Sequence, residues 1–239
     1  MKYRLDNFLV LKGLTPTRSQ AESWIKLGKV QVNGQTATKP GFFVNEADSV
    51  MLLASEQYVS RAGLKLASVA KALHLDFAGG VVLDVGSSTG GFTDYALQHQ
   101  AKKVIAVDVG TDQLHPSLRG NPAIELHEKT DIRSMRRLSA EPDIVVIDVS
   151  FISLREILPH VAMLSSPNTK IVAMLKPQFE AGDSVKHKGV IKNDRLRREI
   201  VHDFEQWAKQ HFVIRHKADS EVAGAKGNRE RFYLLSKIS

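Results

Sequence analysis

The feature that most constrains the fold is an alternation of short apolar strands with helical segments, which runs from Arg61 towards the C-terminus. Strands are predicted at 81–83, 104–107, 123–126, 143–147, 171–175, 212–215 and 232–235. Helices are predicted at 61–75, from the loop after the first strand to residue 97, at 154–164 and at 194–209. Such an alternation predicts a mostly parallel sheet covered on both faces, which is an α/β fold. Ligands of these sheets bind outside the carboxyl ends of the strands.

A glycine-rich loop follows the first of these strands, at residues 84–94. Its glycines allow the backbone to approach a ligand at a helix N-terminus, where free N–H groups favour an anion. The spacing is neither that of an NAD fingerprint nor that of a P-loop. Asp84 precedes the loop and can bind an ammonium group, and Asp108 ends the next strand, where a carboxylate binds ribose hydroxyls. An ammonium, a carboxylate and a ribose together describe S-adenosylmethionine.

Four charged residues are predicted at the mouths of the strands. Asp148 follows strand 143–147, Lys176 follows strand 171–175, and Glu230 precedes the last strand. Lys65 lies on the helix that enters this region. In the proposed fold all four side chains converge on one cleft.

The first 55 residues have a different pattern and predict a small α+β unit. Helices are expected at 4–11 and 17–27, and strands at 30–32 and 48–53, with a tight turn at Asn33-Gly34. Residues 56–60 are interpreted as a short linker, and residues 61–239 as the second domain.

Composition restricts the function further. The chain has 33 Lys and Arg against 26 Asp and Glu, a net charge of +7, which favours an anionic partner such as nucleic acid. Residues 186–198 alone hold six basic residues and one acid. The absence of cysteine excludes a disulfide scaffold, a cysteine-ligated zinc site and a thiol nucleophile. No apolar run approaches the ~20 residues of a membrane helix and no secretion signal is found, so a cytoplasmic protein is expected.

The N-terminal unit resembles the alpha-L RNA-binding domain first named in a small-subunit ribosomal protein. The resemblance rests on Arg4-Leu5-Asp6, on 17–21, on Gly28-Lys29-Val30-Gln31-Val32-Asn33-Gly34 and on Lys39-Pro40. It implies that the second helix and the hairpin face RNA and contact its phosphates. The candidate RNA contacts in the chain are Arg4, Arg18, Lys26, Lys29, Lys39, Arg61, Lys186, Lys188 and Arg195.

Nearly the whole chain resembles the TlyA family, in which such a domain precedes an FtsJ-like methyltransferase domain. The resemblance rests on 59–66, 84–93, 148–153, 176–180 and 227–230. It implies a Rossmann-like class I methyltransferase with a seven-stranded sheet, which methylates the 2′-hydroxyl of cytidine in ribosomal RNA or ribosomal subunits, with S-adenosylmethionine and no metal. The implied catalytic set is Lys65, Asp148, Lys176 and Glu230. The implied cofactor contacts are Asp84, Gly86, Ser87, Ser88, Thr89, Gly90, Gly91, Phe92, Asp108, Val109, Asp131 and Asp148.

One motif departs from the family pattern. Thr130-Asp131-Ile132-Arg133 stands where the family commonly has Thr-Asn-x-Arg, although Asp131 can still accept a hydrogen bond from the adenine amino group. The chain also starts close to the RNA-binding motif, which favours large-subunit RNA as the substrate.

The chemistry requires a base, because a ribose 2′-hydroxyl holds its proton tightly. Our hypothesis is that Lys176, once neutral, acts as a base or a hydrogen-bond acceptor toward the 2′-hydroxyl, while Asp148 orients Lys176 near the methyl group. Glu230 would orient Lys65 and the ribose.

Two other functions compete with this one. The family has carried a haemolysin label, which would mean a membrane-active toxin, but the sequence has no strongly amphipathic basic helix. A ribosome-assembly factor without catalysis is disfavoured by the intact loop and the complete catalytic set.

Overall fold

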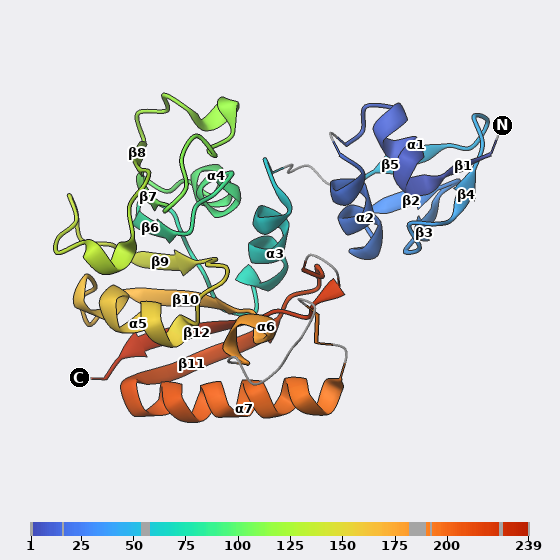
Figure 1. Cartoon of the computed structure of the whole chain (residues 1–239). Helices are drawn as coiled ribbons and strands as arrows, with labels where there is room; N and C mark the ends of the chain where they lie inside the picture. Colours follow the sequence, from blue (N-terminus) through green and yellow to red (C-terminus); the bar gives the residue numbers. More distant parts are fainter. Residues whose placement is uncertain are drawn as a thin grey trace.

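The computed structural model describes residues 2–15, 17–53, 58–181, 190–191, 193–224 and 227–238. These residues form two units that meet at residues 58–60 (Figure 1). The predicted RNA contacts Lys186 and Lys188, and residues 56–57 of the predicted linker, lie outside the described residues.

The N-terminal unit packs two helices beside two small antiparallel sheets. Its elements are β1 (Tyr3–Arg4), α1 (Leu5–Leu11), α2 (Arg18–Lys26), β2 (Val30–Val32), β3 (Gln35–Ala37), β4 (Phe43–Val44) and β5 (Val50–Leu52), with sheet orders β3-β2-β5 and β1-β4. The α2 helix begins at Arg18 because the side chain of Thr17 accepts a hydrogen bond from the amide of Gln20. Asn33 and Gly34 both have positive φ and turn β2 into β3.

The second unit is built on a seven-stranded sheet with the order β11-β12-β10-β9-β6-β7-β8. The strands are β6 (Val81–Val85), β7 (Lys103–Val107), β8 (Ile124–His127), β9 (Ile144–Ile147), β10 (Lys170–Leu175), β11 (Phe212–Asp219) and β12 (Arg231–Lys237). β12 runs antiparallel to both of its neighbours, β10 and β11, and the other strand pairs of this sheet are parallel. The predicted α/β fold with a mostly parallel seven-stranded sheet is therefore confirmed.

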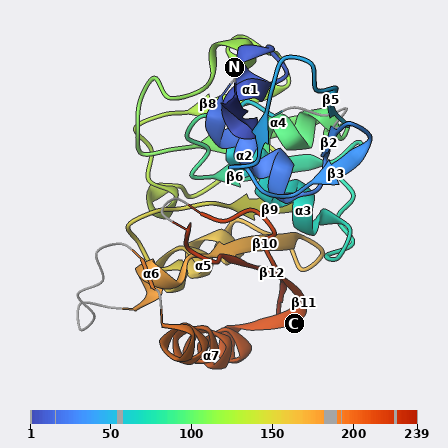
Figure 2. The ribbon, with the colours of Figure 1, turned by 90° about the vertical axis from the view of Figure 1, so that its right-hand side faces the viewer.

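Helices cover both faces of this sheet (Figures 1 and 2). They are α3 (Arg61–Ala70), α4 (Gly91–Gln98), α5 (Leu154–Met163), α6 (Pro177–Glu180) and α7 (Asp194–His211), with 3-10 turns η1 (Pro116–Leu118) and η2 (Ile132–Ser134). Alternate residues of each strand enter different cores: Val82 packs with the core that includes α3 and α4, whereas Leu83 packs with the core that includes α5 and α7. This period of two explains why the central strands are mostly apolar, with Asp84 of β6 as a buried exception.

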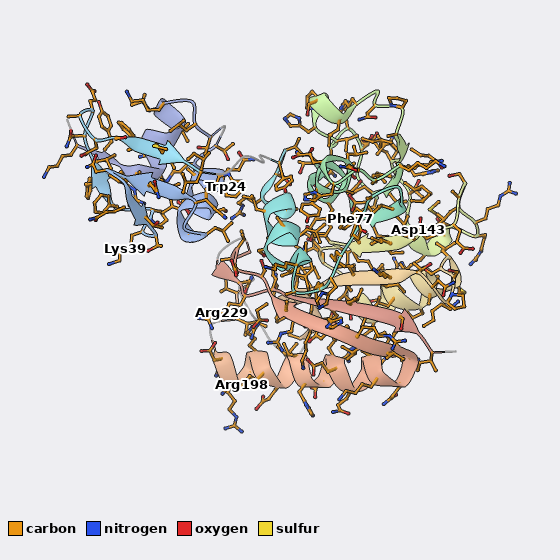
Figure 3. All side chains as sticks on the ribbon, turned by 180° about the vertical axis from the view of Figure 1, so that it is seen from behind. Trp24, Lys39, Phe77, Asp143, Arg198 and Arg229 are labelled. Carbon is orange, nitrogen blue, oxygen red and sulfur yellow. The ribbon has the colours of Figure 1, made fainter. Side chains whose placement is uncertain are left out.

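Residues 58–60 connect the two units through specific hydrogen bonds. The side chain of Gln20 on α2 donates to the carbonyl oxygen of Tyr58 at 2.6 Å, and the amide of Val59 donates to Asp94 on α4 at 2.7 Å. Ser60 then caps α3. In Figure 3, Trp24 of α2 lies on the side of the N-terminal unit that faces α3.

The structure differs from the predictions at element ends. The helix predicted at 61–75 ends at Ala70, and a series of turns follows in which His74 has positive φ. The strand predicted at 212–215 continues to Asp219. The β1–β4 pair was not predicted, because strands of two residues have no periodicity to detect.

Candidate active site

Two adjacent cavities lie at the carboxyl ends of β6, β7 and β9. The larger has a volume of about 510 Å³, and of the predicted cofactor contacts it is lined by Gly86, Ser88, Asp108, Val109, Asp131 and Asp148. The smaller, of about 140 Å³, shares Gly86, Ser88 and Asp148 with it and is also lined by Asp84, Ser87, Thr89, Phe92 and Lys176. The predicted contacts Gly90 and Gly91 line neither cavity and instead begin α4.

Glycine conformation shapes the loop between β6 and α4. Gly86 has a φ of 82°, and a Cβ atom there would lie 2.8 Å from the carbonyl oxygen of Asp148. Gly90 caps α4 in the left-handed conformation with a φ of 88°. A side chain at either position would strain the backbone, and at Gly86 it would also separate β6 from β9.

Asp84 is a buried carboxyl group with an unused acceptor. One oxygen accepts a hydrogen bond from the hydroxyl of Thr93 at 2.7 Å, and the other, Oδ1, has no hydrogen-bond partner among the described residues. Burial raises the pKa of Asp84 to about 7, and the nearby Asp148 acts in the same direction. Because a buried acceptor without a partner is costly, this oxygen is suited to a cationic donor from a ligand.

Asp108 and Asp131 both line the larger cavity and have different partners. Asp108 accepts from the amides of Ser88 at 2.8 Å and Gly110 at 2.7 Å, which holds the glycine-rich loop against β7. Asp131 forms an ion pair with Arg133 at 2.7 Å, and this guanidinium lowers the pKa of Asp131. At the position that departs from the family pattern, the structure therefore holds a charged acceptor.

The four predicted catalytic residues form two largely buried ion pairs. Lys176 Nζ lies 2.5 Å from Asp148 Oδ1, and Lys65 Nζ lies 2.6 Å from Glu230 Oε2. Strand register explains their convergence, because Leu175 of β10 pairs with Arg231 of β12, so that the residues just beyond them, Lys176 and Glu230, are at the same edge of the sheet.

Lys65 reaches this edge from a different element. Ala62, one turn earlier on α3, lines the smaller cavity, and Lys65 follows it on the same helical face. The structure thus brings all four residues together, and their catalytic roles stay predictions.

Two residues near Lys176 were not predicted. Ser150 Oγ accepts a hydrogen bond from Lys176 Nζ at 2.8 Å. Phe151 is 90% exposed and has a φ of 65°. It lines the larger cavity, and the centroid of its ring lies 5.0 Å from that of Phe179. Both follow Asp148 closely in the same motif, but only the structure reveals that the aromatic ring is exposed in a strained conformation.

The predicted RNA contacts of the N-terminal unit include an organised arginine pair. The fully buried carboxylate of Asp6 binds Arg4 at 2.8 Å and Arg18 at 3.0 Å, while both guanidinium groups are about half exposed. These hydrogen bonds lower the pKa of Asp6 against the effect of burial, so the carboxylate stays charged.

The other described RNA candidates are at least partly exposed. Lys26, Lys29 and Lys39 are exposed, Arg61 is partly exposed, and Arg195 is exposed and paired with Glu199 at 3.0 Å. Figure 3 shows Lys39 on the N-terminal unit, with Arg198 and Arg229 at the end of the second unit that lies towards it.

The described part of the chain lacks two further features. Within it, no group of three or more His, Asp or Glu side chains is arranged to hold a metal ion. None of its helices is long and apolar enough to cross a membrane.

Comparisons with known proteins agree with both units. The family profile of the FtsJ-like methyltransferases matches residues 58–237, and that of the S4 domain matches residues 4–50. The chain is 36% identical to the 23S rRNA (cytidine-2′-O)-methyltransferase TlyA of Campylobacter jejuni, over 97% of this chain and 98% of that protein. It is 37% identical to Hemolysin A of Brachyspira hyodysenteriae, over 95% and 97%. A solved structure from Streptococcus thermophilus, provisionally classed as a hemolysin, has a TM-score of 0.73 and 34% identity, covering 100% of this chain and 89% of that one.

Proposed function

The chain belongs to the FtsJ-like methyltransferase family, and from this premise we propose that it transfers a methyl group from S-adenosylmethionine to the 2′-hydroxyl of a cytidine in ribosomal RNA. The observation that carries the proposal is the pair of buried ion pairs, Lys176–Asp148 and Lys65–Glu230, at the edge of the sheet where the cavities open. The substrate class follows the Campylobacter relative, which is named for this reaction on 23S rRNA.

The cavities fit the cofactor in size and in chemistry. A volume of about 510 Å³ is in the usual range for a small-molecule site. The unpartnered oxygen of Asp84 would take the ammonium group, Asp108 the ribose and Asp131 the adenine amino group. When bound, S-adenosylmethionine supplies an electrophilic methyl group on a sulfonium centre. The protein must then position the 2′-hydroxyl and remove its proton.

Lys176 is the proposed acceptor of that proton. Lys176 lines the smaller cavity, and its Nζ lies 2.5 Å from Asp148 Oδ1 and 2.8 Å from Ser150 Oγ. When the amine is neutral it takes the hydroxyl proton, and the ammonium that results is stabilised by the Asp148 carboxylate. Glu230 fixes Lys65 as a second cation, which would orient the ribose.

Phe151 is the proposed platform for the target base. Phe151 remains 90% exposed in a strained conformation although its ring contacts Phe179, and a nucleobase stacked on it would cover this exposed apolar surface. Base–aromatic stacking is worth about 1–3 kcal/mol per base. This contact would hold a cytosine that has been turned out of an RNA helix near Lys176.

The N-terminal unit supplies the second part of RNA binding. Arg4 and Arg18 present two guanidinium groups fixed by one carboxylate, an arrangement suited to a backbone phosphate. Phosphate contacts position RNA without reading its sequence, so the choice of nucleotide would come from the shape of the RNA at the active site.

The decisive experiment is methyl transfer from radiolabelled S-adenosylmethionine to ribosomal RNA. Purified protein would be incubated with free RNA and with separated subunits from a strain that lacks the gene, followed by mapping of 2′-O-methyl positions. Label in a cytidine ribose supports the proposal, and the labelled RNA identifies the subunit. Absence of label from every substrate, with wild-type protein that binds S-adenosylhomocysteine, would contradict it. Dye release from liposomes is the parallel test of the name that the Brachyspira relative carries.

A further inference from the structure

The turn before β12 leaves no space beside Glu230. Gly224 lies in this turn, and a Cβ atom there would be 2.3 Å from Glu230 Oε1 and 2.8 Å from its Cδ. The other carboxylate oxygen, Oε2, lies 2.6 Å from Lys65 Nζ. The carboxylate is thus held between a residue that has no side chain and the ammonium group that it pairs with.

The backbone around Gly224 is fixed on both sides. Its amide donates to the carbonyl oxygen of Asn228 at 2.8 Å, and its carbonyl oxygen accepts from the amide of Gly227 at 3.0 Å. The carbonyl oxygen of Glu230 accepts from the amide of Ser220 at 3.0 Å. A methyl group at position 224 would therefore meet a backbone that cannot easily retreat, so the Glu230 side chain would have to move.

From this geometry we infer that Gly224 is a positioning residue for Glu230 in methyl transfer. The φ of Gly224 is not in the left-handed region, so an alanine is compatible with the backbone. A glycine is therefore needed at position 224 because a side chain would not fit beside Glu230, and not because of the backbone conformation. The inference rests on the proposed function, because it gives Glu230 a part in the reaction.

The size of the effect follows from the required movement. Relieving a contact of 2.3 Å to the ordinary separation of at least 3.4 Å moves the carboxylate by about 1 Å, and a misplacement of about 1 Å can cost about 100-fold in rate. The far end of a side chain can make this movement without unfolding the protein. Gly224→Ala should accordingly lower kcat by about 10- to 100-fold.

The test is a double-mutant cycle with Glu230→Gln. We expect Gly224→Ala to lower kcat while the affinity for S-adenosylhomocysteine, measured by calorimetry, and the thermal midpoint are unchanged. In the Glu230→Gln background the same substitution should add no further loss, because the ion pair is already broken. Gly80→Ala is the matched control, since a Cβ there meets its neighbours at 3.4 Å or more.

Each alternative result has a distinct meaning. An unchanged kcat in Gly224→Ala, a loss of the same size in both backgrounds, or a lower thermal midpoint would overturn the inference. If Glu230→Gln alone leaves kcat unchanged, it is the role of Glu230 in the proposed function that fails.

Discussion

Asp84 should make cofactor affinity depend on pH. Its buried carboxyl group has a pKa of about 7 without ligand, whereas a free aspartic acid has a value of 3.8. The ammonium group of the cofactor binds the ionised carboxylate, so binding below this pKa must first release a proton. Each pH unit below 7 therefore weakens binding by up to about tenfold.

The magnitude can be stated for two conditions. One pH unit above 7 about 90% of the carboxyl groups are ionised, and one unit below about 10% are, so the dissociation constant should rise about tenfold between them. Calorimetric titration with S-adenosylhomocysteine at these two pH values measures the change. Adenosine has no ammonium group and serves as the ligand control. The Asp84→Asn variant should bind S-adenosylhomocysteine weakly and with the same affinity at both pH values.

The same carboxyl group affects stability with the opposite sign. Because its pKa is raised in the folded protein, the folded state holds the proton more tightly than the unfolded state, and ligand-free stability falls as pH rises from about 4 to about 7. The full size of this contribution is about 4 kcal/mol. Equal wild-type affinity on both sides of neutrality, or an equal pH response in Asp84→Asn, would refute this reasoning.

Three further substitutions test separate parts of the site. Lys176→Ala should abolish methyl transfer and leave S-adenosylhomocysteine binding intact, as measured by tritium incorporation and calorimetry; retained turnover would exclude Lys176 as the base. Phe151→Ala should raise the KM for RNA by about 5- to 150-fold, corresponding to about 1–3 kcal/mol of stacking, whereas Phe151→Tyr should not. Asp6→Asn should weaken RNA binding in a filter assay even though it makes the protein more positive, because Arg4 and Arg18 lose the carboxylate that orients them. Tighter binding would show that charge alone governs this surface.

The convergence of the four candidate catalytic residues was predictable from the topology of the sheet. In a parallel sheet the carboxyl ends of the strands lie at one edge, and because β9 and β10 are neighbours, Asp148 and Lys176 lie close together. The antiparallel β12 begins at the same edge, which accounts for the position of Glu230 just before it. The pairings Lys176–Asp148 and Lys65–Glu230 agree with the predicted orienting partners.

The features that could not be predicted depend on conformation and not on pattern. Phenylalanine is usually a core residue, but the bend of the chain after Asp148 gives Phe151 a positive φ and leaves it exposed. Asp6 is a charged residue in an apolar helix, and its burial under Arg4 and Arg18 requires the folded contact between α1 and α2. Hydrophobic periodicity reveals neither the exposure of Phe151 nor the burial of Asp6, because each concerns a single residue.

The helix α3 packs against the junction between the two units. A Cβ atom at Gly63 would lie 2.5 Å from the Cβ of Tyr58 and 2.9 Å from the carbonyl oxygen of Gly91, so α3 is packed directly against both the junction and the start of α4. Lys65 is two residues further along α3, and its partner Glu230 belongs to the sheet. Any displacement of α3 would therefore separate Lys65 from Glu230 while leaving Lys176 and Asp148, which both belong to the sheet edge, together.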